Sequence, residues 1–594
     1  MRHNNPAVAI ALCLFAAAAL AGPVNQDQPN DLAAALKLIP PDAVAFAAIS
    51  DLQRANSEVA GLIAAMDLPE SVLAGKPIDQ LKALLGVAGH FDDAGALVVW
   101  MQMRDGLPVG VLAIPTDDSA AFIAANLLPF VSEDGPAAPE GALGFHGTPV
   151  FARAAEKHAL VSTDRSLVDS YEPGVGLAAS LTARIGAAGV KALERGEFCA
   201  WTDGAALAQV RGGDGADGPV SVMGVELSRS PRSLTLSASV QGADAQAPAD
   251  PWASDLAVAI DVEPLGVCAR TFIKPAEGSA LSKLAAATGG TRPASFSDLP
   301  AQRAYFALAF NPPTGSSIAD AIPEGVPLPP AVLAWITGAG ELVTQVQLAA
   351  YPSKLGILAG GFLNDSAMVM LSPKPTELRD FLRDQLQALP PESEGVRRSV
   401  KWEDARQLKD GTTVAAFEVK ETALGANGGA GAQAQLFAAQ AMVRQALLGP
   451  RGLHGFVRCT SDAVVVTFSQ RQDVLERATA AAAAGGKTLE GEEIVRAIRP
   501  WLLDQPHFIA LLWSGQVARA IEQVAGSFGA GGMISLPVDL DPVGFAARIE
   551  GGCIDTAIMV PTSVMVAGYE QVKKGAMNAA AVEDPSPVPE PNSP

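Results

Sequence analysis

The sequence predicts an α+β protein of two duplicated halves, each a mostly antiparallel sheet with amphipathic helices packed on it. Three observations lead to this fold class. Short β-prone apolar runs alternate with amphipathic helical segments, several runs are joined by turns of two or three residues, and similar strand-and-helix units recur in the same order in both halves. Such short turns require antiparallel pairing, because parallel strands need a long crossover connection.

The first 21 residues have the pattern of a secretory signal peptide. Arg2 and His3 precede an uncharged apolar run from Ala7 to Leu20, and Ala19-Leu20-Ala21 is a small-x-small cleavage site. We expect cleavage after Ala21 and a periplasmic or secreted mature protein. The alternative is an uncleaved anchor, but the run is shorter than the roughly 20 residues that a membrane-spanning helix needs.

Composition limits the partners. The chain has 594 residues, a formal net charge of −21 and no dense cluster of Lys and Arg, so nucleic acid is not an expected partner. Hydrophobic residues make up 49% of the chain but aromatic residues only 5%, which predicts cores of small aliphatic side chains. Outside the leader no uncharged apolar stretch is long enough to span a bilayer, so we expect no integral membrane segment in the mature chain.

One local unit recurs along the chain: a short apolar strand, then a Ser or Thr often followed by Asp, then a helix. Its predicted strands are Val44–Ile49, Gly110–Ile114, Ala159–Val161, Phe198–Trp201, Met368–Leu371, Ala463–Thr467 and Phe508–Trp513. A Ser or Thr at a helix N-cap accepts a hydrogen bond from a free N–H group, and Asp suits the positive end of the helix dipole. We interpret these hydroxyls, Thr376 among them, as caps rather than catalytic groups.

The helices that follow these strands carry apolar residues at helical spacing. One face holds Leu52, Val59, Leu62, Ile63 and Met66, and another holds Leu378, Phe381, Leu382, Leu386 and Leu389. Two predicted turns make hairpins: 104–106 joins 96–103 to 108–114, and 364–365 joins 356–362 to 367–371. Further strands are expected at 220–226, 233–240, 543–550 and 554–560.

The two halves are expected to cover residues 22–288 and 294–578. The match rests on Val150–Arg153 with Thr163 against Phe456–Arg458 with Ser469, and on Phe198–Trp201 with Thr202 against Ile509–Trp513 with Ser514. The glycines at 289 and 290 mark the boundary. Residues 579–594 are expected to form a disordered Pro-rich tail.

No motif assigns a reaction. The sequence from Gly213 to Gly218 fits G-x-G-x-x-G, but a helical segment precedes it and Pro219 follows, so we interpret it as a flexible turn. The histidines His90, His146, His158, His454 and His507 lack metal-ligand spacing, and His146 and His454 precede the matched hairpins. We predict no catalytic residue, cofactor site or metal ligand, and we place Trp100, Trp201 and Trp513 in the core.

Four cysteines follow the leader: Cys199, Cys268, Cys459 and Cys553. An even number in an oxidising compartment allows two disulfides. Pairing within each half gives Cys199 with Cys268 and Cys459 with Cys553. The alternative is four buried thiols, since a chain this long folds without covalent links.

The segment Ile39–Leu52, which follows the leader, resembles the start of large secreted bacterial proteins of unknown function that are abundant in planctomycetes. Domains of those proteins open with Pro-x-Asp before an apolar strand and a helix capped by Asp, here Pro40-Pro41-Asp42 and Ser50-Asp51. Ala43 and Phe46 depart from the commoner hydroxyl and Tyr. The resemblance implies an exported α+β protein and no activity.

These observations predict a non-catalytic extracytoplasmic protein that binds or scaffolds something at the cell envelope. The expected partner is an envelope protein or a ligand held in a cleft between the halves. The alternative is a secreted hydrolase whose site is assembled from His146, His158 or scattered carboxylates.

Overall fold

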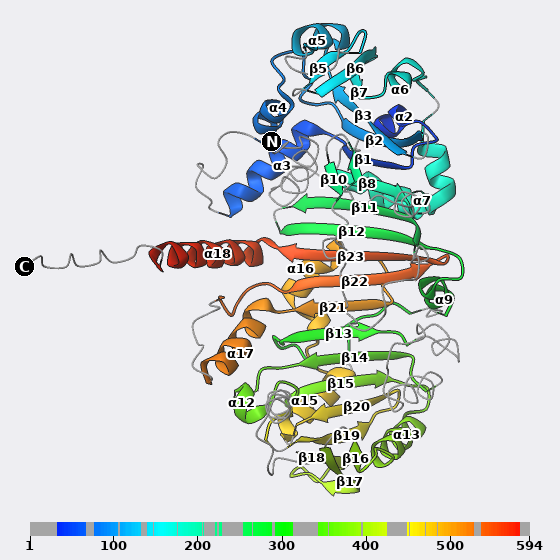
Figure 1. Ribbon diagram of the computed structural model, residues 1–594. Helices are drawn as coiled ribbons and strands as arrows, with labels where there is room; N and C mark the ends of the chain where they lie inside the picture. Colours follow the sequence, from blue (N-terminus) through cyan, green and yellow to red (C-terminus); the bar gives the residue numbers. More distant parts are fainter. Residues whose placement is uncertain are drawn as a thin grey trace, which may run out of the picture. The chain divides into compact units, whose positions relative to one another are not determined.

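The computed structural model describes residues 32–582 except 67–76, 132–138, 207–219, 228–252, 288–291, 313–341, 424–447, 528–535 and shorter gaps of one or two residues (Figure 1). The predicted signal peptide, the 213–218 turn, His146 and the boundary glycines at 289 and 290 lie outside the described residues.

The chain divides into two compact units. Among the described residues, unit 1 consists of those up to Ala287 together with Ala547–Met559, and unit 2 of the remainder. The predicted halves, 22–288 and 294–578, are each continuous in sequence, whereas unit 1 also takes in the segment Ala547–Met559.

Unit 1 alternates strands and helices along the chain. Its helices are α2 (Leu32–Leu38), α3 (Leu52–Ala65), α4 (Pro77–Leu85), α5 (Ser119–Asn126), α6 (Arg165–Asp169), α7 (Ala178–Arg195) and α9 (Ala280–Ala287). Its strands are β1 (Ala45–Ile49), β2 (Leu97–Arg104), β3 (Leu107–Pro115), β4 (Leu128–Pro129), β5 (Leu143–Phe145), β6 (Thr148–Ala155), β7 (His158–Ser162), β8 (Phe198–Asp203), β9 (Val220–Val222), β10 (Val225–Leu227), β11 (Ala253–Glu263) and β12 (Gly266–Pro275).

The strands of unit 1 pair antiparallel in the order β6-β7-β3-β2-β1-β8-β11-β12. Strand β1 therefore lies between its near neighbour in sequence, β2, and the distant β8: Phe46 faces Trp100 on one side and Trp201 on the other. The short strand β5 pairs with the first residues of β6, and β4 pairs with β5. The hairpin predicted around residues 104–106 is confirmed as β2 and β3.

Unit 2 has the same mixture of elements. Its strands are β13 (Phe306–Phe310), β14 (Gln345–Ala350), β15 (Ser366–Leu371), β16 (Glu392–Ser393), β17 (Val396–Gln407), β18 (Thr413–Ala423), β19 (Leu453–Cys459), β20 (Ala463–Phe468) and β21 (Phe508–Leu512). Its helices are α12 (Ile357–Gly360), α13 (Pro375–Gln387), α15 (Gln472–Ala482), α16 (Glu493–Ile498), α17 (Ser514–Ser527) and α18 (Thr562–Val582), with 3-10 turns η2 (Leu489–Gly491) and η3 (Arg499–Trp501). Strands β22 (Val543–Glu550) and β23 (Cys553–Pro561) contain residues of both units.

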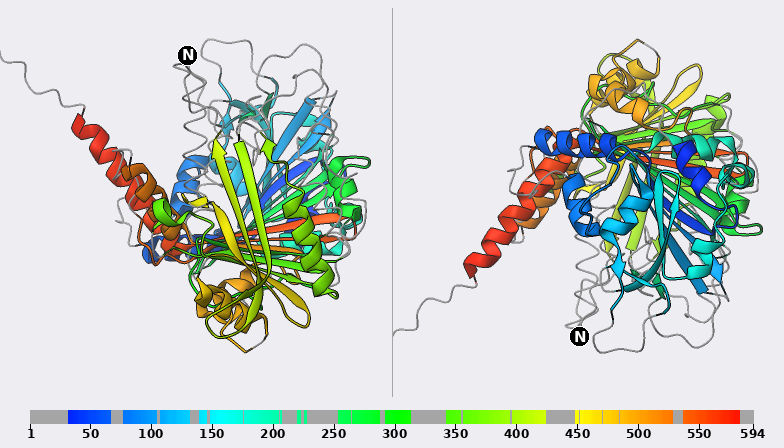
Figure 2. Two further views of the ribbon diagram at one scale, coloured as in Figure 1. Left: turned by 90° about the horizontal axis from the view of Figure 1, so that it is seen from below. Right: turned by 90° about the horizontal axis from the view of Figure 1, so that it is seen from above.

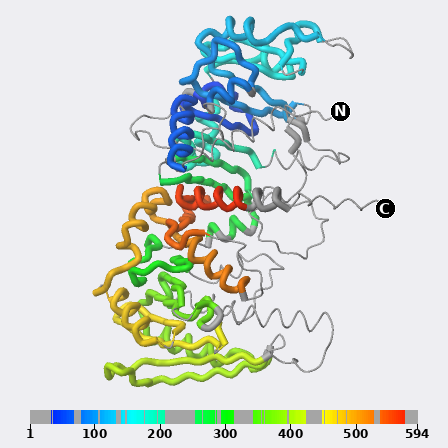
Figure 3. Tube along the Cα trace, turned by 90° about the vertical axis from the view of Figure 1, so that its left-hand side faces the viewer, coloured from blue at the N-terminus to red at the C-terminus, as the bar shows by residue number. Residues whose placement is uncertain are grey.

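The strands of unit 2 pair antiparallel in the order β17-β18-β19-β20-β15-β14-β13-β21. Strand β13 lies between its near neighbour β14 and the distant β21, as β1 lies between β2 and β8. The hairpin β17–β18, yellow-green in Figure 3, continues the ladder beyond β19. Both units are thus antiparallel sheets with packed helices, and the predicted α+β class is confirmed.

Each unit has its own apolar core. Helix α3 buries Leu52, Val59, Leu62, Ile63 and Met66, as its spacing predicts. In unit 2, helix α13 lies against β17, β19 and β20 (Figure 2) and packs Leu378, Phe381, Leu382 and Leu386 onto the core. The indoles of Trp100, Trp201 and Trp513 are at most 2% exposed, which confirms their core placement.

The cap prediction is wrong in its residues, although helices begin where it expects them. Asp51, Asp118 and Asp164 are the N-caps, and their carboxylates accept hydrogen bonds from the first helical N–H groups. The predicted hydroxyl caps Ser50, Thr116 and Thr163 directly follow the strands and lie one or two residues before the N-cap. Helix α13 has Lys374 as its N-cap residue, and the Lys374 side chain makes no capping hydrogen bond; Thr376 lies inside the first turn.

Three further predictions are corrected. Instead of one strand at 220–226 there are two short antiparallel strands, β9 and β10, and the strand expected at 233–240 lies outside the described residues. Residues 356–362 form no strand: Ile357–Gly360 is a helical turn bracketed by Gly356 and Gly361, whose φ angles of +74° and +83° favour glycine. Helix α18 continues to Val582, so residues 579–582 of the predicted tail are helical, and the rest of the tail lies outside the described residues.

All four described cysteines are free thiols. Cys199 on β8 pairs with Ala259 on β11, while Cys268 on β12 pairs with Asp261, two residues further along β11. One whole strand therefore separates the two cysteines, and two ladder spacings of about 4.8 Å exceed the roughly 7 Å that a disulfide spans between Cα atoms. Cys459 lies on β19 in unit 2, whereas Cys553 packs against the core of unit 1.

Candidate functional site

A pocket in unit 2 combines charged and apolar side chains. Its volume is about 390 Å³, and it is lined by Arg303, Leu489, Glu492, Glu493, Ile494, Ala497 and Trp513. The lining comes from the chain before β13, from η2 and α16, and from the end of β21. It brings one guanidinium and two carboxylates next to aliphatic and indole surface.

Backbone hydrogen bonds fix the two walls of this pocket. The N–H of Leu489 donates to the carbonyl of Leu299 over 2.8 Å, and the N–H of Ala301 donates to the carbonyl of Lys487 over 3.0 Å. The N–H of Trp513 donates to the carbonyl of Tyr305 over 3.0 Å, which brings the indole to the pocket from β21. The segment that carries Arg303 is therefore held on both sides by the sheet and by η2.

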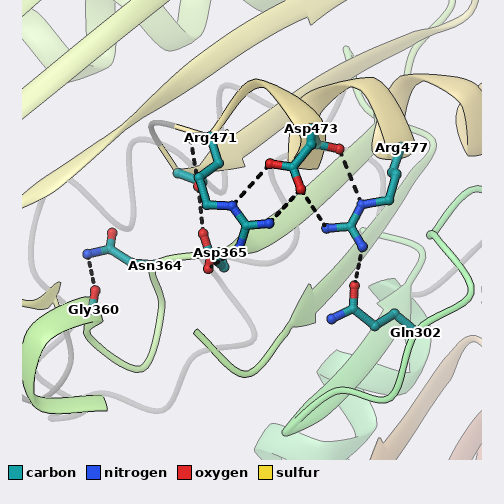
Figure 4. A network of polar contacts seen from close by, with 8 residues as sticks. Gln302, Gly360, Asn364, Asp365, Arg471, Asp473 and Arg477 are labelled. Carbon is teal, nitrogen blue, oxygen red and sulfur yellow. Dashed lines mark hydrogen bonds and ion pairs between the residues drawn. The ribbon is translucent and has the colours of Figure 1, made fainter. Parts of the chain in front are cut away.

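A polar network supports the residue next to Arg303 (Figure 4). Arg477 on α15 donates to the Gln302 side chain over 2.5 Å and forms an ion pair with Asp473. Asp473 also binds Arg471, which reaches Asp365 at the start of β15 over 3.1 Å. The network thus links the Gln302 segment, helix α15 and β15, and we assign it a positioning role.

Asp365 is the strained member of that network. Its φ of +79° is rare for a residue with a side chain, and its exposed fraction is 7%. Its carboxylate accepts hydrogen bonds from the Ser469 hydroxyl over 2.6 Å and from Arg471 over 3.1 Å. These contacts offset the backbone strain, so the predicted cap Ser469 instead anchors the turn before β15.

A second polar cluster lies in the core of unit 1. Glu58, Glu197 and Asp261 are 2%, 2% and 6% exposed, and Arg54 and Arg270 form ion pairs with them. Burial is the main cause that raises the pKa of Glu197, to about 9, and the neighbouring carboxylates of Glu58 and Asp261 add to it. Burial also raises the pKa of Glu58.

Three of the described histidines contact different partners. His158 at the start of β7 contacts the carbonyl of Ala96 over 3.0 Å, and burial lowers its pKa. His454 on β19 contacts the carbonyl of Gly452, and His90 contacts Asp117. Within the described part of the chain, no group of three or more His, Cys, Asp or Glu residues has a metal-binding arrangement.

No sequence motif marks these two sites, but one residue of the unit 1 cluster has a signal in the sequence. Glu58 lies on the apolar face of α3, three residues after Ala55 and four before Leu62, where a charge needs a buried partner. No comparable signal identifies Arg303, because only the tertiary structure brings it to η2 and α16.

The chain matches no protein-family model, and no curated protein sequence matches it. A solved structure titled "Structure of crystal form III of TP0453" aligns with 46% of this chain and 96% of its own, at 9% identity and a TM-score of 0.22. A score this low carries no argument about fold or function. No described helix is both long enough and apolar enough to cross a membrane.

Proposed function

We propose that this protein is a non-catalytic extracytoplasmic binding protein whose unit 2 pocket holds a small zwitterionic ligand with an apolar body. The lining of the pocket carries the proposal. Arg303 offers donors to a carboxylate, Glu492 and Glu493 accept from an ammonium group, and Leu489, Ile494 and Trp513 contact apolar atoms. A volume of about 390 Å³ suits a ligand of amino-acid or dipeptide size.

The same lining favours binding over hydrolysis. Among the described residues, those that line the pocket include no Ser, Thr, Cys, His or Lys side chain that could act as a nucleophile or be activated by a neighbouring base. Glu492 and Glu493 are consecutive at the start of α16, so they do not face each other as an acid and base pair does. The carboxylates that do converge, in unit 1, are in the core.

Calorimetric titration of the full chain tests the proposal. The probes are leucine, leucyl-leucine and its N-acetylated amide, which has the same apolar body without the charges. We expect leucine or leucyl-leucine to bind and the blocked peptide not to bind. Arg303→Ala should weaken binding at least tenfold. Arg496→Ala is the control: Arg496 lies on α16 but does not line the pocket, so this change should leave binding unaltered.

Three outcomes contradict this proposal. Equal binding of the blocked and free peptides excludes recognition of the charges, and no binding of any probe excludes the zwitterionic class. Release of free leucine from leucyl-leucine or from leucine esters, abolished by a pocket substitution, favours the hydrolase instead.

We also propose that the protein is exported and that its mature form starts at Gly22. The pattern of residues 2–21 supports this proposal. N-terminal sequencing of the protein from its natural host should find Gly22 first. Recovery of Met1 in a membrane fraction contradicts it.

Finally, we propose that the two units arose by duplication. The shared pairing order supports this: β6-β7-β3-β2-β1-β8 in unit 1 corresponds to β19-β20-β15-β14-β13-β21 in unit 2. The register also supports a correspondence of Trp201 with Leu511 rather than with Trp513. Trp201 faces β1 three residues after Phe198, and Leu511 faces β13 three residues after Phe508. Superposition of the six matched strands is the test, and a failure to superpose contradicts duplication.

A further inference from the structure

The buried charge cluster of unit 1, defined as Arg54, Glu58, Glu197, Asp261 and Arg270, joins four elements. Arg54 on α3 donates to Glu58 and to Glu197, each over 2.8 Å. Arg270 on β12 donates to Asp261 on β11 over 2.6 Å. The second oxygen of Glu197, just before β8, accepts the N–H of Val262 over 3.0 Å.

Glu58 and Glu197 both pair with the guanidinium of Arg54, and their side chains are only 2% and 3% exposed. If both acids are ionised, two buried negative charges meet the single positive charge of Arg54. An unbalanced buried charge is strongly unfavourable, and a carboxyl group in that position takes up a proton instead. Cys268 on β12 lies near Arg270 and Asp261, and burial raises the pKa of its thiol, so that it stays neutral.

The hydrogen bonds locate this proton between two side chains. The Oε2 atom of Glu58 is buried and receives no hydrogen bond from any described N–H or hydroxyl group. The Oε1 atoms of Glu58 and Glu197 each lie 2.8 Å from the guanidinium of Arg54, so the two carboxyl groups lie side by side at one cation. A protonated Glu197 can donate to Glu58, whereas two ionised carboxylates can only repel each other.

We infer that Glu58 and Glu197 share one proton at neutral pH, and that loss of this proton as the pH rises weakens the attachment of α3 to the sheet of unit 1. Arg54 and Glu58 lie on α3, and Glu197, Asp261 and Arg270 come from the strand side. Ionisation of Glu197 therefore places repulsion at the junction between helix and sheet. The cluster is a pH-responsive element of the fold and does not depend on the ligand proposed for unit 2.

The sign of the pH dependence follows from linkage. The pKa of Glu197 in the folded protein is about 9, above the roughly 4.3 of an unfolded glutamate. Between these values the folded state holds a proton that the unfolded state has released. The opening equilibrium of unit 1 should therefore rise about tenfold per pH unit for this one proton, from mildly acidic pH up to about pH 9.

Hydrogen exchange of the full chain, followed by mass spectrometry between pH 5 and pH 8, tests the inference. After correction for the intrinsic exchange rate, the opening constant of peptides covering 52–65 should rise with pH at about tenfold per unit. Glu197→Gln, which resembles the protonated carboxyl, should remove most of that slope. Glu277→Gln, at an exposed position of the same unit, should keep the wild-type slope.

Infrared spectroscopy at pH 7 gives an independent measurement. A protonated carboxyl has a C=O band that ionised carboxylates lack, and this band should be present in the wild type and absent in Glu197→Gln. Absence of the band in the wild type, or an unchanged slope in Glu197→Gln, overturns the inference. If Glu197→Gln does not fold, Glu58→Gln should likewise reduce the slope, and its failure to do so has the same meaning.

Discussion

Strand β8 of unit 1 and strand β21 of unit 2 hold the same place in the pairing order, but the polar groups next to them differ. In unit 1 the N–H of Ser50, after β1, donates to the carbonyl of Glu197 over 3.1 Å, and in unit 2 the N–H of Asn311, after β13, donates to the carbonyl of His507 over 3.0 Å. The Glu197 side chain belongs to the buried charge cluster. Asn311 instead begins a chain of neutral amides.

The amide chain of unit 2 satisfies its polar groups without burying unbalanced charge. The Gln345 side chain donates to Asn311 over 3.0 Å, and Gln347 donates to Gln345 over 2.8 Å and to Asp298 over 2.6 Å. Gln345 and Gln347 are completely buried. In the charge cluster of unit 1 and in the amide chain of unit 2, buried polar groups are paired with one another. Of the two, only the carboxylates of unit 1 exchange a proton. The comparison predicts one pH-sensitive unit and one insensitive unit.

The units also differ at the end of the ladder. Strands β17 and β18 of unit 2 form a hairpin of 12 and 11 residues, where unit 1 has β4 and β5 with 2 and 3 residues. The longer hairpin buries Ala415, Phe417 and Val419 against the core of unit 2. Its outer strand β17 is charged and interrupted by a bulge between Glu403 and Arg406, which protects an edge from pairing with other chains.

The largest expected effect tests the matched core positions. Trp201→Ala should destabilise unit 1 by about 3–5 kcal/mol and Leu511→Ala should destabilise unit 2 by about 2–5 kcal/mol, because each removes a buried side chain and leaves a cavity. Urea unfolding measures both. Leu128→Ala, at a position 68% exposed, is the control and should change little. A negligible loss for Leu511→Ala breaks the correspondence with Trp201.

The amide chain provides the next test. Gln345→Ala should destabilise unit 2 by about 1–3 kcal/mol, since it leaves buried amide groups of Asn311 and Gln347 without their partner. The loss should be equal at pH 5 and pH 8, as measured by urea unfolding at both values. The chain ends at the Asp298 carboxylate, to which Gln347 donates. A loss that differs between pH 5 and pH 8 shows that the chain exchanges a proton in this range, which contradicts the contrast between the units.

Helix caps give a smaller effect. Asp118→Ala should cost about 1 kcal/mol, because its carboxylate accepts the N–H groups of Ala120 and Ala121 at the start of α5. Thr376→Ala, in the helix after the matching strand of unit 2, should change stability by no more than a few tenths of a kcal/mol, since Thr376 is not the cap. Thermal unfolding of the two variants compares them, and equal losses restore the cap role of Thr376.

No stability change is expected on reduction, because the described cysteines are free thiols. A reducing agent should leave the Tm unchanged, and alkylation of unfolded, unreduced protein should modify Cys199, Cys268, Cys459 and Cys553. In the folded protein Cys199 and Cys268 should react most slowly, since burial raises the pKa of each thiol to about 12. A mass that shows fewer than four modified positions indicates a disulfide.

The sequence alone was sufficient to predict most local structure. All seven repeated strand runs correspond to observed strands, including β7, β15 and β20. Alternating apolar runs and helical spacing reflect burial on one face, and that burial is local enough to be visible in the order of residues. The antiparallel class could also be predicted locally, because strands that are close in sequence, such as β2 and β3, pair as hairpins.

Only the tertiary structure decided what meets across long separations. It placed β1 beside β8, put β11 between Cys199 and Cys268, and brought Glu58 to Glu197 and Arg303 to Glu492. None of these contacts has a periodic or local signature. Pairing order depends on how whole faces are buried against one another, and the charge cluster and the pocket are consequences of that order.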